Sequence, residues 1–411
     1  MKKRIFAALL ALCLTALTGC DWSTADPEDI FGTLTDYYNV EQKKQDVKLT
    51  SFALPYLKGE TADPITCSDG AMQTLGALVY EGLFALDGQF EAQPALAESY
   101  TYDAARYTYT ITLRSGVTFS DGSAVTAQDV VNSLRRAQSS ARYSGRLAEV
   151  SDIRASGGAV RITLTGDNRS FVSRLDIPIV KSGTESSTFP TGTGPYAYSG
   201  EGGAHLAQNA SWWQGKSLPL ERIELTACKD TDSVSYAFYA REVQLLFCDL
   251  TGADDSSVYG SGDYTDAATT IMQYLCLNTR RAPFDDPAVR RAVTLGVDRA
   301  SCVSAYLLGH GLAAQFPVSP ASGLYPKDLE TAYSQDGYAS ALEAAGLNTG
   351  KTRSLTLLVN QESSFRVSTA QTIAAGLSRY DLQVTVRSLP YDEYVPVSYT
   401  HLRAHETSQD L

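Results

Sequence analysis

The chain has 411 residues, with 34 Lys and Arg against 46 Asp and Glu, a net charge of −12 and 44% hydrophobic residues. This share of apolar residues excludes a disordered chain, and the length predicts about two or three domains. Nucleic-acid binders need clustered basic residues to neutralise phosphates, so the acidic balance argues against that class. A protein with several membrane spans is also excluded, because only one long apolar run occurs.

That apolar run lies at the N-terminus and has the form of a secretory signal. Lys2, Lys3 and Arg4 precede residues 5–17, a stretch too short to cross a bilayer. The run ends in Leu-Thr-Gly followed by Cys20, which resembles a bacterial lipobox. The resemblance implies that residues 1–19 are removed and that Cys20 is acylated. The alternative is an ordinary signal peptide with an incidental cysteine.

An acylated Cys20 would attach the protein to a membrane, because buried methylene groups supply the affinity. The polar stretch 20–46 is then expected to be a tether. We therefore expect the protein in the cell envelope, either on the outer face of the cytoplasmic membrane or in the periplasm.

The folded part is expected to open with a helix, a strand and a second, capped helix. Apolar residues at helical spacing predict a helix over 71–80, and alternation predicts a half-buried strand over 107–113. Asp121-Gly122 is a turn signal. Thr126 stands three residues before Asp129, a spacing that caps helix starts. The predicted buried side of this helix consists of Val130, Val131, Leu134 and Ala137.

The second half of the chain shows further strand and helix patterns. Asp286-Pro287 is a favoured start for a helix, and Asp298 opens another that is expected to end at Gly309. Because strand and helix patterns alternate from about residue 270 onward, we expect an α/β lobe there. The remaining predictions are strands over 160–164, 355–359 and 384–386 and a helix over 368–377.

The last residues depart from this pattern. Pro396 is expected to interrupt a helix that starts at 392–394. Residues 397–411 resemble translated sequencing-adapter sequence, so we interpret them as a non-native tail. The alternative is an authentic exposed terminus, and no chemistry is assigned to its histidines.

The search for catalytic and metal-binding patterns is mostly negative. The motifs GxSxG, HExxH, GxxxxGK[ST] and GxGxxG do not occur. Outside the tail the histidines are His205 and His310, which we expect to be solvated rather than catalytic. The cysteines after Cys20 are five, an odd number without CxxC spacing, so at least one thiol is free in a monomer. We expect no cofactor and no metal site.

A series of sequence blocks resembles the family 5 solute-binding proteins of ABC importers, which include oligopeptide-, dipeptide- and nickel-binding proteins. The resemblance extends over about 47–396. The blocks are YEGLF at 80–84, PALAES at 94–99, YTYTITLR at 107–114, GVTFSDG at 116–122, TAQDVV at 126–131, GTGPY at 192–196, LNT at 277–279, PFDD at 283–286, VRRAV at 289–293 and VDR at 297–299.

The resemblance implies an α/β, two-lobed fold of the periplasmic-binding-protein type, which closes like a Venus flytrap. Residues 47–270 would form the first lobe, with an extra domain inserted at about 71–185. Residues 271–396 would form the second lobe, which is expected to be truncated because the family's chain continues further. We expect such a truncated chain to fold poorly, since strand edges stay unpaired.

The resemblance also implies a function. The protein would capture an oligopeptide, a dipeptide-like ligand or a similar small solute and deliver it to an ABC permease and ATPase complex, unchanged. A monomer is expected, with no enzyme activity, no nucleic acid and membrane contact through Cys20. The alternatives are a sensory or pheromone peptide receptor on the same fold, and a secreted hydrolase.

Candidate ligand residues in the first lobe come from two segments. Ser68, Asp69 and Gly70 align with a ligand-lining stretch of the family, where Asp69 could pair with a cationic group and Gly70 would allow close backbone approach. The alternative is a helix-capping loop. The segment formed by Gly192, Thr193, Gly194 and Tyr196 would shape the cleft, or it is a structural turn. Trp212 and Trp213 are expected to pack.

Three further candidates belong to the second lobe. Tyr274 and Asn278 would face the cleft at the entry to that lobe. Arg366 stands where relatives often place a basic residue for a ligand carboxylate, and its guanidinium can bind a carboxylate with two hydrogen bonds. The alternative for Arg366 is a solvated surface residue.

Overall fold

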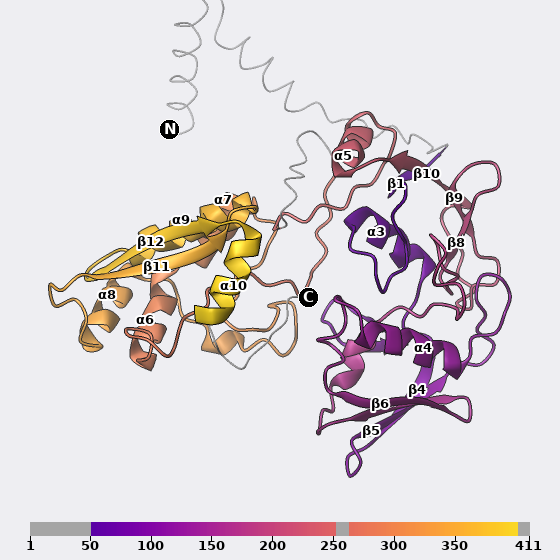
Figure 1. Ribbon diagram of the computed structural model, residues 1–411, viewed down its shortest axis with the longest axis horizontal. Helices are drawn as coiled ribbons and strands as arrows, with labels where there is room; N and C mark the ends of the chain where they lie inside the picture. Colours follow the sequence, from indigo (N-terminus) through magenta and orange to yellow (C-terminus); the bar gives the residue numbers. More distant parts are fainter. Residues whose placement is uncertain (1–50, 252–262, 402–411) are drawn as a thin grey trace, which may run out of the picture. The chain divides into compact units, whose positions relative to one another are not determined.

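The computed structural model describes residues 51–251 and 263–401 (Figure 1). We call these ranges the N-terminal region and the C-terminal region. The predicted signal, Cys20, the tether and residues 402–411 of the tail lie outside the described residues. Within the described ranges, no helix has both the length and the apolar character needed to cross a membrane.

Helices and strands are mixed in the N-terminal region. In chain order its elements are β1 (Ala53–Leu57), α3 (Gly70–Val79), β2 (Phe84–Leu86), β3 (Ala92–Pro94), β4 (Ala97–Asp103), β5 (Thr108–Leu113), α4 (Ala127–Gln138), β6 (Val150–Ser156), β7 (Ala159–Leu164), the 3₁₀ helix η1 (Phe171–Arg174), β8 (Tyr196–Ser199), β9 (His205–Gln208), β10 (Arg222–Cys228) and α5 (Thr231–Tyr239).

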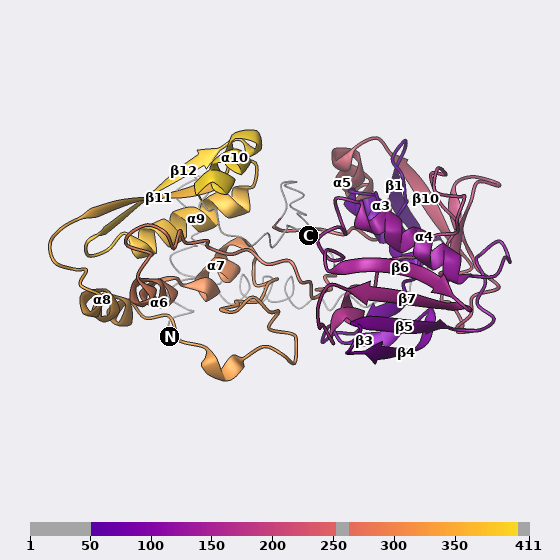
Figure 2. The same ribbon diagram turned by 60° about the horizontal axis from the view of Figure 1, so that its bottom comes forward.

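The strands of the N-terminal region form two larger sheets and a small hairpin. One sheet has the order β1-β10-β9-β8, in which β1 runs parallel to β10 and the other pairs are antiparallel. The second is an antiparallel sheet of order β4-β5-β7-β6, and β2 pairs with β3. Figure 2 shows the strands of the second sheet side by side, with α4 over one face.

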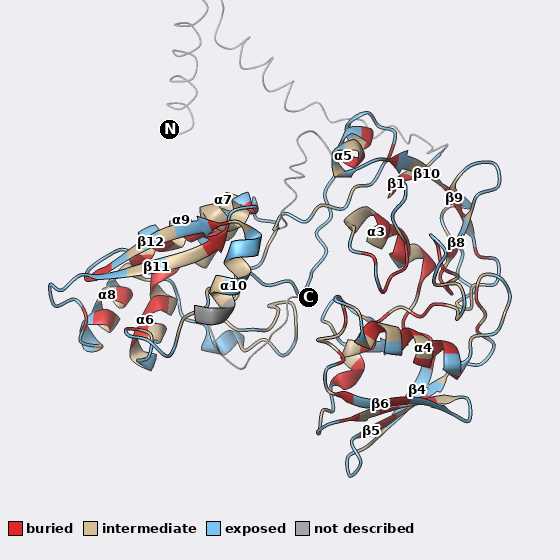
Figure 3. Ribbon diagram, in the orientation of Figure 1, coloured by how far each residue is buried: buried red, intermediate tan, exposed pale blue. Residues whose placement is uncertain are grey.

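The helix α4 begins as the sequence predicts. The Asp129 backbone N–H donates to the Thr126 hydroxyl over 3.2 Å, and the Thr126 N–H donates to the Asp129 carboxylate over 3.0 Å. This reciprocal capping box satisfies two donors that a helix start leaves unpaired. The four predicted residues of its apolar side, Val130, Val131, Leu134 and Ala137, are all buried against the sheet (Figure 3).

The predicted strands of this sheet are also confirmed. In β5 the side chains of Tyr109 and Ile111 are buried, and in β7 those of Val160, Ile162 and Leu164 are buried. Alternation with period two places these side chains on one face, where they pack under α4. Tyr109 also donates its hydroxyl to the Asn168 carbonyl over 2.6 Å, which satisfies its polar end.

The N-terminal region has two apolar cores. One lies between α4 and the sheet β4-β5-β7-β6 and takes its residues from Ile65 and from positions 83–179. The other lies around the sheet β1-β10-β9-β8 and includes Leu54, Met72, Leu75 and Ile223. The helix α3, predicted over 71–80, belongs to this second core.

The elements of the C-terminal region begin with helices. In chain order they are α6 (Pro287–Gly296), α7 (Arg299–Tyr306), the 3₁₀ helix η2 (Lys327–Leu329), α8 (Gln335–Ala344), β11 (Arg353–Asn360), α9 (Ser364–Leu377), β12 (Leu382–Leu389) and α10 (Tyr391–His401).

A two-stranded parallel sheet and three helices enclose the core of the C-terminal region. The strands β11 and β12 pair in parallel over their whole length. Buried residues from α6, α8, α9 and β12 form the core, and Tyr338 of α8 is fully buried within it. The Tyr338 hydroxyl donates to the Leu377 carbonyl over 3.1 Å, which joins α8 to the end of α9.

The order of the first elements and two helix boundaries differ from the prediction. The region opens with α6, α7 and α8 before its first strand, so strands and helices alternate only from β11 onward. The helix α9 starts at Ser364 rather than at position 368, because the Ser363 hydroxyl accepts from the Arg366 N–H over 3.2 Å. The helix α7 ends at Tyr306 rather than at Gly309, because Leu308 has left the helical conformation, with φ of 51°.

The prediction that Pro396 interrupts a helix is wrong. The helix α10 continues through Pro396 to His401. A proline in a helix removes one backbone donor, and in α10 this single loss does not end the helix. Positions 397–401 of the predicted tail therefore belong to α10.

Candidate functional site

The loop that leads into α3 contains three of the predicted ligand residues. Asp69 caps the helix, because its carboxylate accepts from the Met72 N–H over 2.9 Å. Ser68 is exposed, and Asp69 and Gly70 are half-buried. A Cβ atom on Gly70 would lie 3.7 Å from the Phe247 ring, which is ordinary contact, so neighbouring atoms do not demand glycine here. The capping alternative thus describes what the Asp69 carboxylate does in this structure.

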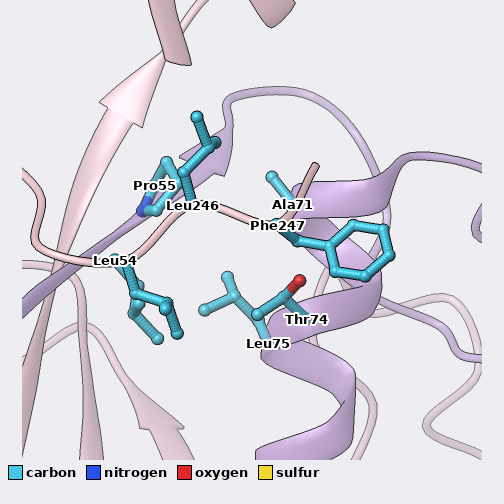
Figure 4. A pocket seen from close by; sticks show the side chains of 8 residues that line it. Leu54, Pro55, Ala71, Thr74, Leu75, Leu246 and Phe247 are labelled. Atoms are coloured by element: carbon cyan, nitrogen blue, oxygen red, sulfur yellow. The ribbon is translucent and has the colours of Figure 1, made fainter. Parts of the chain in front are cut away.

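Next to this loop is a small apolar hollow, with a cavity volume of about 10 Å³, room for no more than one water-sized probe. Phe247, which stands at the rim of this hollow, is 51% exposed. Figure 4 shows side chains from β1, from α3 and from the segment after α5 converging around it. The lining residues are Leu54, Pro55, Ala71, Thr74, Leu75, Leu245, Leu246 and Phe247.

The hollow offers apolar surface and almost no hydrogen-bonding groups. Its one polar side chain is Thr74, whose hydroxyl donates to the Gly70 carbonyl within α3 over 2.9 Å. A group of a bound molecule that contacts this surface would therefore gain by removing apolar area from water.

The predicted segment Gly192 to Tyr196 lies at the opposite end of α3. A Cβ atom on Gly192 would stand 2.1 Å from the Val79 carbonyl oxygen, and one on Gly194 would stand 2.6 Å from the Val79 carbonyl carbon. The Gly194 N–H donates to that same Val79 oxygen over 2.9 Å. Glycine is needed at both positions because backbone meets backbone there.

The side chains of Thr193 and Tyr196 are buried within the N-terminal region. Tyr196 is buried and donates its hydroxyl to the Leu220 carbonyl over 2.9 Å. Thr193 is fully buried. A ten-residue helix is about 15 Å long, so α3 keeps this segment apart from the loop at Asp69. The two predicted groups of the first lobe are therefore not brought together.

Glu81 is a residue that the sequence analysis did not single out. Its carboxylate accepts hydrogen bonds from the Trp212 indole over 3.1 Å and from the Trp213 indole over 2.7 Å. The Thr193 hydroxyl donates over 3.0 Å and the Gln214 amide over 3.2 Å. Four donors on one carboxylate join the end of α3 to two distant segments. No local sequence signal links positions 81, 193 and 212–214.

Trp213 packs as predicted, and both tryptophans have a polar role through Glu81. Trp213 contacts the core under α4, and the Arg114 guanidinium lies over its ring at 4.6 Å from the ring centre. An arginine over an indole face is a favourable cation–π arrangement. Trp213 therefore contacts Glu81 through its indole N–H and Arg114 through the face of its ring.

Polar groups gather behind the loop at Cys67. Asp63 is buried and pairs with Arg136, and its carboxylate also accepts from the Ile65 N–H over 3.1 Å. Burial raises the pKa of the Tyr80 phenol, and the nearby Asp63 charge adds to the shift. Burial also raises the pKa of the Cys67 thiol. Both groups are therefore neutral at pH 7, and neither is an activated nucleophile.

The three candidates in the C-terminal region have different surroundings. Tyr274 is 60% exposed. The Asn278 side-chain oxygen accepts from the Arg280 N–H over 3.0 Å. Arg366, in the first turn of α9, donates from Nη1 to the Asn360 side-chain oxygen over 3.2 Å. Its Nε is buried and has no hydrogen-bond partner among the described residues, so one side of the guanidinium fork is unused.

The histidine prediction holds for one residue and fails for the other. His205 is buried in β9, where Nδ1 contacts the Gly203 carbonyl at 2.8 Å and Nε2 contacts Arg222 at 3.2 Å. It is a packed strand residue and not a solvated one. His310 is partly exposed and lies 2.8 Å from the Asp266 carboxylate. All five cysteines in the described ranges are free.

Comparison with known proteins adds a family match. A family model described as bacterial extracellular solute-binding proteins, family 5 Middle, matches residues 91–408. Among curated proteins, the glutathione-binding protein GsiB of Escherichia coli K12 is 28% identical over 294 residues, which are 67% of this chain and 55% of that protein. GsiB of Shigella flexneri matches with the same identity and coverage. The chain thus spans about half the length of these curated relatives.

Solved structures show the same mixed α/β fold. A nickel ABC transporter structure from Bacillus halodurans superposes with a TM-score of 0.67 at 24% identity, covering 86% of this chain and 77% of that one. The periplasmic binding protein DppA of Helicobacter pylori, solved with the peptide STSA, gives a TM-score of 0.54 at 19% identity, covering 84% and 75%. At these identities the likeness concerns the fold.

Proposed function

Because the chain belongs to the family 5 bacterial extracellular solute-binding proteins, we propose that it is the substrate-binding component of an ABC importer. The family is one of binding proteins and not of enzymes. The family match over 91–408 carries the proposal. In this role the protein binds a solute outside the cytosol and hands it, chemically unchanged, to a permease and its ATPase.

We propose that binding uses two lobes, 47–270 and 271–396, which close on the solute about a hinge. Separate apolar cores in the N-terminal and C-terminal regions support this division. The inserted domain corresponds to the core under α4, which takes its residues mainly from 83–179. Since α3 packs with β1 and β8, we draw the start of the insertion after α3.

The solute class that we propose is peptide-like. Support comes from the curated relatives, which are named for binding glutathione, a small peptide-like molecule. The exposed Phe247, at the edge of the hollow, would contact an apolar side chain of such a solute. Backbone groups of an extended peptide can pair with protein backbone, so affinity does not require a matching charge for each side chain.

Arg366 is the residue that we propose for the carboxylate of the solute. Its Nη1 donates to the Asn360 side-chain oxygen, and its buried Nε has no hydrogen-bond partner within the described ranges. A solute carboxylate that accepts from this guanidinium would form a charge-assisted hydrogen bond, which is stronger than a neutral one. Ser68, Asp69, Gly70, Tyr274 and Asn278 remain proposed contacts. For Gly192, Thr193, Gly194 and Tyr196 we propose a supporting role beneath the site.

A thermal-shift titration tests binding and the role of Arg366 together. Glutathione and trialanine are the probes, and nickel chloride is a comparison. A ligand that binds only the folded state raises the melting temperature, and at a given concentration a tighter ligand raises it more. Arg366→Leu should remove the shift by a probe with a free carboxylate, whereas Arg379→Leu, at an exposed position after α9, should keep it.

Two results would contradict the proposal. If no probe shifts the melting temperature of the unaltered chain, the peptide-like solute is wrong. If trialanine is recovered cleaved, the protein is a hydrolase. A sensory receptor on the same fold would bind the probe without restoring peptide uptake to a transport-deficient strain, so an uptake assay separates that alternative.

We propose that Cys20 anchors the protein at the cell envelope through acyl chains, which places it on the outer face of the cytoplasmic membrane or in the periplasm. The motif around Cys20 supports this step. Labelled palmitate should be incorporated into the unaltered chain and not into Cys20→Ala. Incorporation that persists in the variant would refute the anchor.

A further inference from the structure

The sheet β4-β5-β7-β6 has an outer face, on the side away from α4. Its four strands lie side by side in Figure 2, and all of them are within the described residues. Val160 and Ile162 of β7 are buried in the core beneath α4. Because side chains alternate between the two faces of a strand, the half-buried Arg161 lies on the outer face. The register of the strands then gives its neighbours on that face.

Two arginines stand side by side on this outer face. Arg161 lies opposite Thr110 on β5 and opposite Arg154 on β6. Thr101 of β4 lies opposite Thr110, so the row continues across all four strands. Neighbouring strands are about 4.8 Å apart, which brings the two arginine side chains close together where they leave the sheet. We call this row of four residues the arginine row: Thr101, Thr110, Arg161 and Arg154.

The positive charges of the arginine row are poorly compensated. Like charges directly opposite each other on paired strands are destabilising. Arg154 is 59% exposed, and its Nε lies 3.5 Å from the Asp152 carboxylate, an exposed ion pair that contributes little. Arg161 makes no ion pair within the described ranges, and its Nε is buried without a hydrogen-bond partner there. The described part of the chain therefore leaves the charge of Arg161 unpaired.

Hydroxyl groups flank the arginine row on both sides. In one neighbouring row Thr108 lies opposite Thr163, and their hydroxyl oxygens are 3.1 Å apart. In the other, Thr112 lies opposite Ser99, and both residues are exposed. The Asp103 carboxylate, on the edge strand β4, already has an arginine partner at 2.8 Å. The face around Arg161 thus presents guanidinium and hydroxyl donors, which are the groups that bind an anion with several oxygens.

We propose that the arginine row binds a phosphate group. A phosphate monoester carries a charge of about −1.5 to −2 at pH 7, which matches two guanidinium groups better than one carboxylate does. Each guanidinium presents a fork of N–H groups that fits phosphate oxygens, and the Thr110 hydroxyl can donate a further hydrogen bond. The anion lies between Arg154 and Arg161 and removes the unfavourable contact of their like charges. None of the proposed solute contacts lies on this face.

Thermal unfolding of the full chain in sodium phosphate tests the site. Tryptophan fluorescence is the readout, because Trp213 packs against the core of this sheet. At about 10 mM phosphate the melting temperature should rise by about 2 °C or more, relative to sodium chloride of equal ionic strength. Sodium acetate, whose carboxylate carries one charge, should give less than half of this shift. The absence of a phosphate shift, or an equal shift in acetate, overturns the proposal.

Three variants locate the phosphate. Arg161→Gln should lose the phosphate shift, yet in sodium chloride it should melt no lower than the unaltered chain, because it removes one of two adjacent like charges. Arg154→Gln, at a more exposed position, should lose the shift in the same way and decides the matter if Arg161→Gln does not fold. Arg169→Gln is the matched control, because Arg169 is 76% exposed beside Asp167 and lies outside the four strands.

The control also accounts for a general effect of phosphate. Phosphate stabilises folded proteins because it is excluded from their surfaces, and all three variants share this effect. Arg169→Gln should therefore keep the full shift of the unaltered chain. A full shift in Arg154→Gln, or a shift lost equally in Arg169→Gln, overturns the proposal.

The source of the phosphate is decided by two further probes, glycerol 1-phosphate and vesicles of phosphatidylglycerol. Cys20→Ala is the background, with and without Arg154→Gln, so that both chains have the same N-terminus and neither is acylated. A shift with glycerol 1-phosphate that depends on Arg154 assigns the site to a soluble phosphate ester. Vesicle flotation that depends on Arg154 assigns it to a lipid headgroup. If neither probe distinguishes the two chains, the proposal is overturned.

Discussion

The two regions complete their sheets to different degrees. In the N-terminal region the sheet β4-β5-β7-β6 has four strands, and α4 covers one face. In the part of the C-terminal region that the structure describes, the sheet is the parallel pair β11-β12. The antiparallel hairpins β4-β5 and β6-β7 need only short turns, whereas the pairs β5-β7 and β11-β12 each enclose a helix, α4 and α9. Nearby sequence therefore suffices for the two hairpins of the first sheet, but not for the pairing that joins them or for the second sheet.

The regions also differ in how their parts are joined. In the N-terminal region, backbone contact at Gly192 and Gly194 and the four donors on Glu81 tie segments more than 100 positions apart. In the C-terminal region the joints between elements span shorter separations, such as the hydrogen bonds between Tyr338 and Leu377 and between Tyr306 and Thr372. Substitutions at the first set should therefore have the larger effects. Trp212 and Trp213 report unfolding of the N-terminal region by fluorescence.

The largest effect is expected at Gly192. In Gly192→Ala the new methyl group would overlap the Val79 carbonyl oxygen, and backbone on both sides cannot yield. We expect a loss of more than about 3 kcal/mol in the free energy of unfolding, at the upper end for overpacking. Denaturant unfolding followed by tryptophan fluorescence measures it. Gly88→Ala, where no atom lies within 4 Å of the added Cβ, should be nearly neutral. Equal losses would show that the close approach is unimportant.

A smaller loss is expected at Glu81. Glu81→Gln replaces one accepting oxygen by a donating amide, which then faces two donors, either those of Thr193 and Trp213 or those of Trp212 and Gln214. A buried donor left without an acceptor costs free energy, and hydrogen bonds to a charged group are stronger than neutral ones. We therefore expect a loss of about 2–3 kcal/mol in the free energy of unfolding. The same fluorescence measurement applies. Glu91→Gln, at an exposed position, is the control and should change stability little. A neutral Glu81→Gln would mean that the four hydrogen bonds contribute nothing net.

The helix caps compare the two regions directly. Thr126→Ala removes a reciprocal capping box from α4, and we expect a loss of about 1–2 kcal/mol; Ser363→Ala removes a simple cap from α9, and we expect about 1 kcal/mol. Hydrogen exchange at the Asp129 and Arg366 amides measures the local effect. Ser368→Ala, inside α9, should leave both amides unchanged. A larger loss at Ser363 than at Thr126 would reverse the comparison.

The smallest effect concerns acid stability. Hydrogen bonds from Lys181 and Ser123 lower the pKa of Asp121 from 3.8 to about 2. Since the unfolded chain binds the proton at higher pH, this stabilisation is present above about pH 4 and is lost as the pH falls toward about 2. The carboxylate is 42% exposed, so the contribution is less than about 1 kcal/mol. Asp121→Asn should flatten this part of the pH profile of unfolding midpoints. An unchanged profile would contradict the assignment.

Local signals in the sequence determined much of the secondary structure. The spacing of Thr126 and Asp129 predicted a cap because both groups act within one helical turn. The alternation of apolar and polar residues in β5 and β7 predicted their buried faces, because this pattern also repeats within a few residues. Blocks such as YEGLF and GTGPY indicated the family, because their order along the chain can be compared without a three-dimensional structure.

Only the tertiary structure decided how those blocks meet. The glycines of the second block are required because the carbonyl of Val79 lies against them, and Glu81 of the first block receives donors from Thr193 and from 212–214. These contacts join segments that are far apart along the chain, and local sequence patterns do not indicate which distant segments meet.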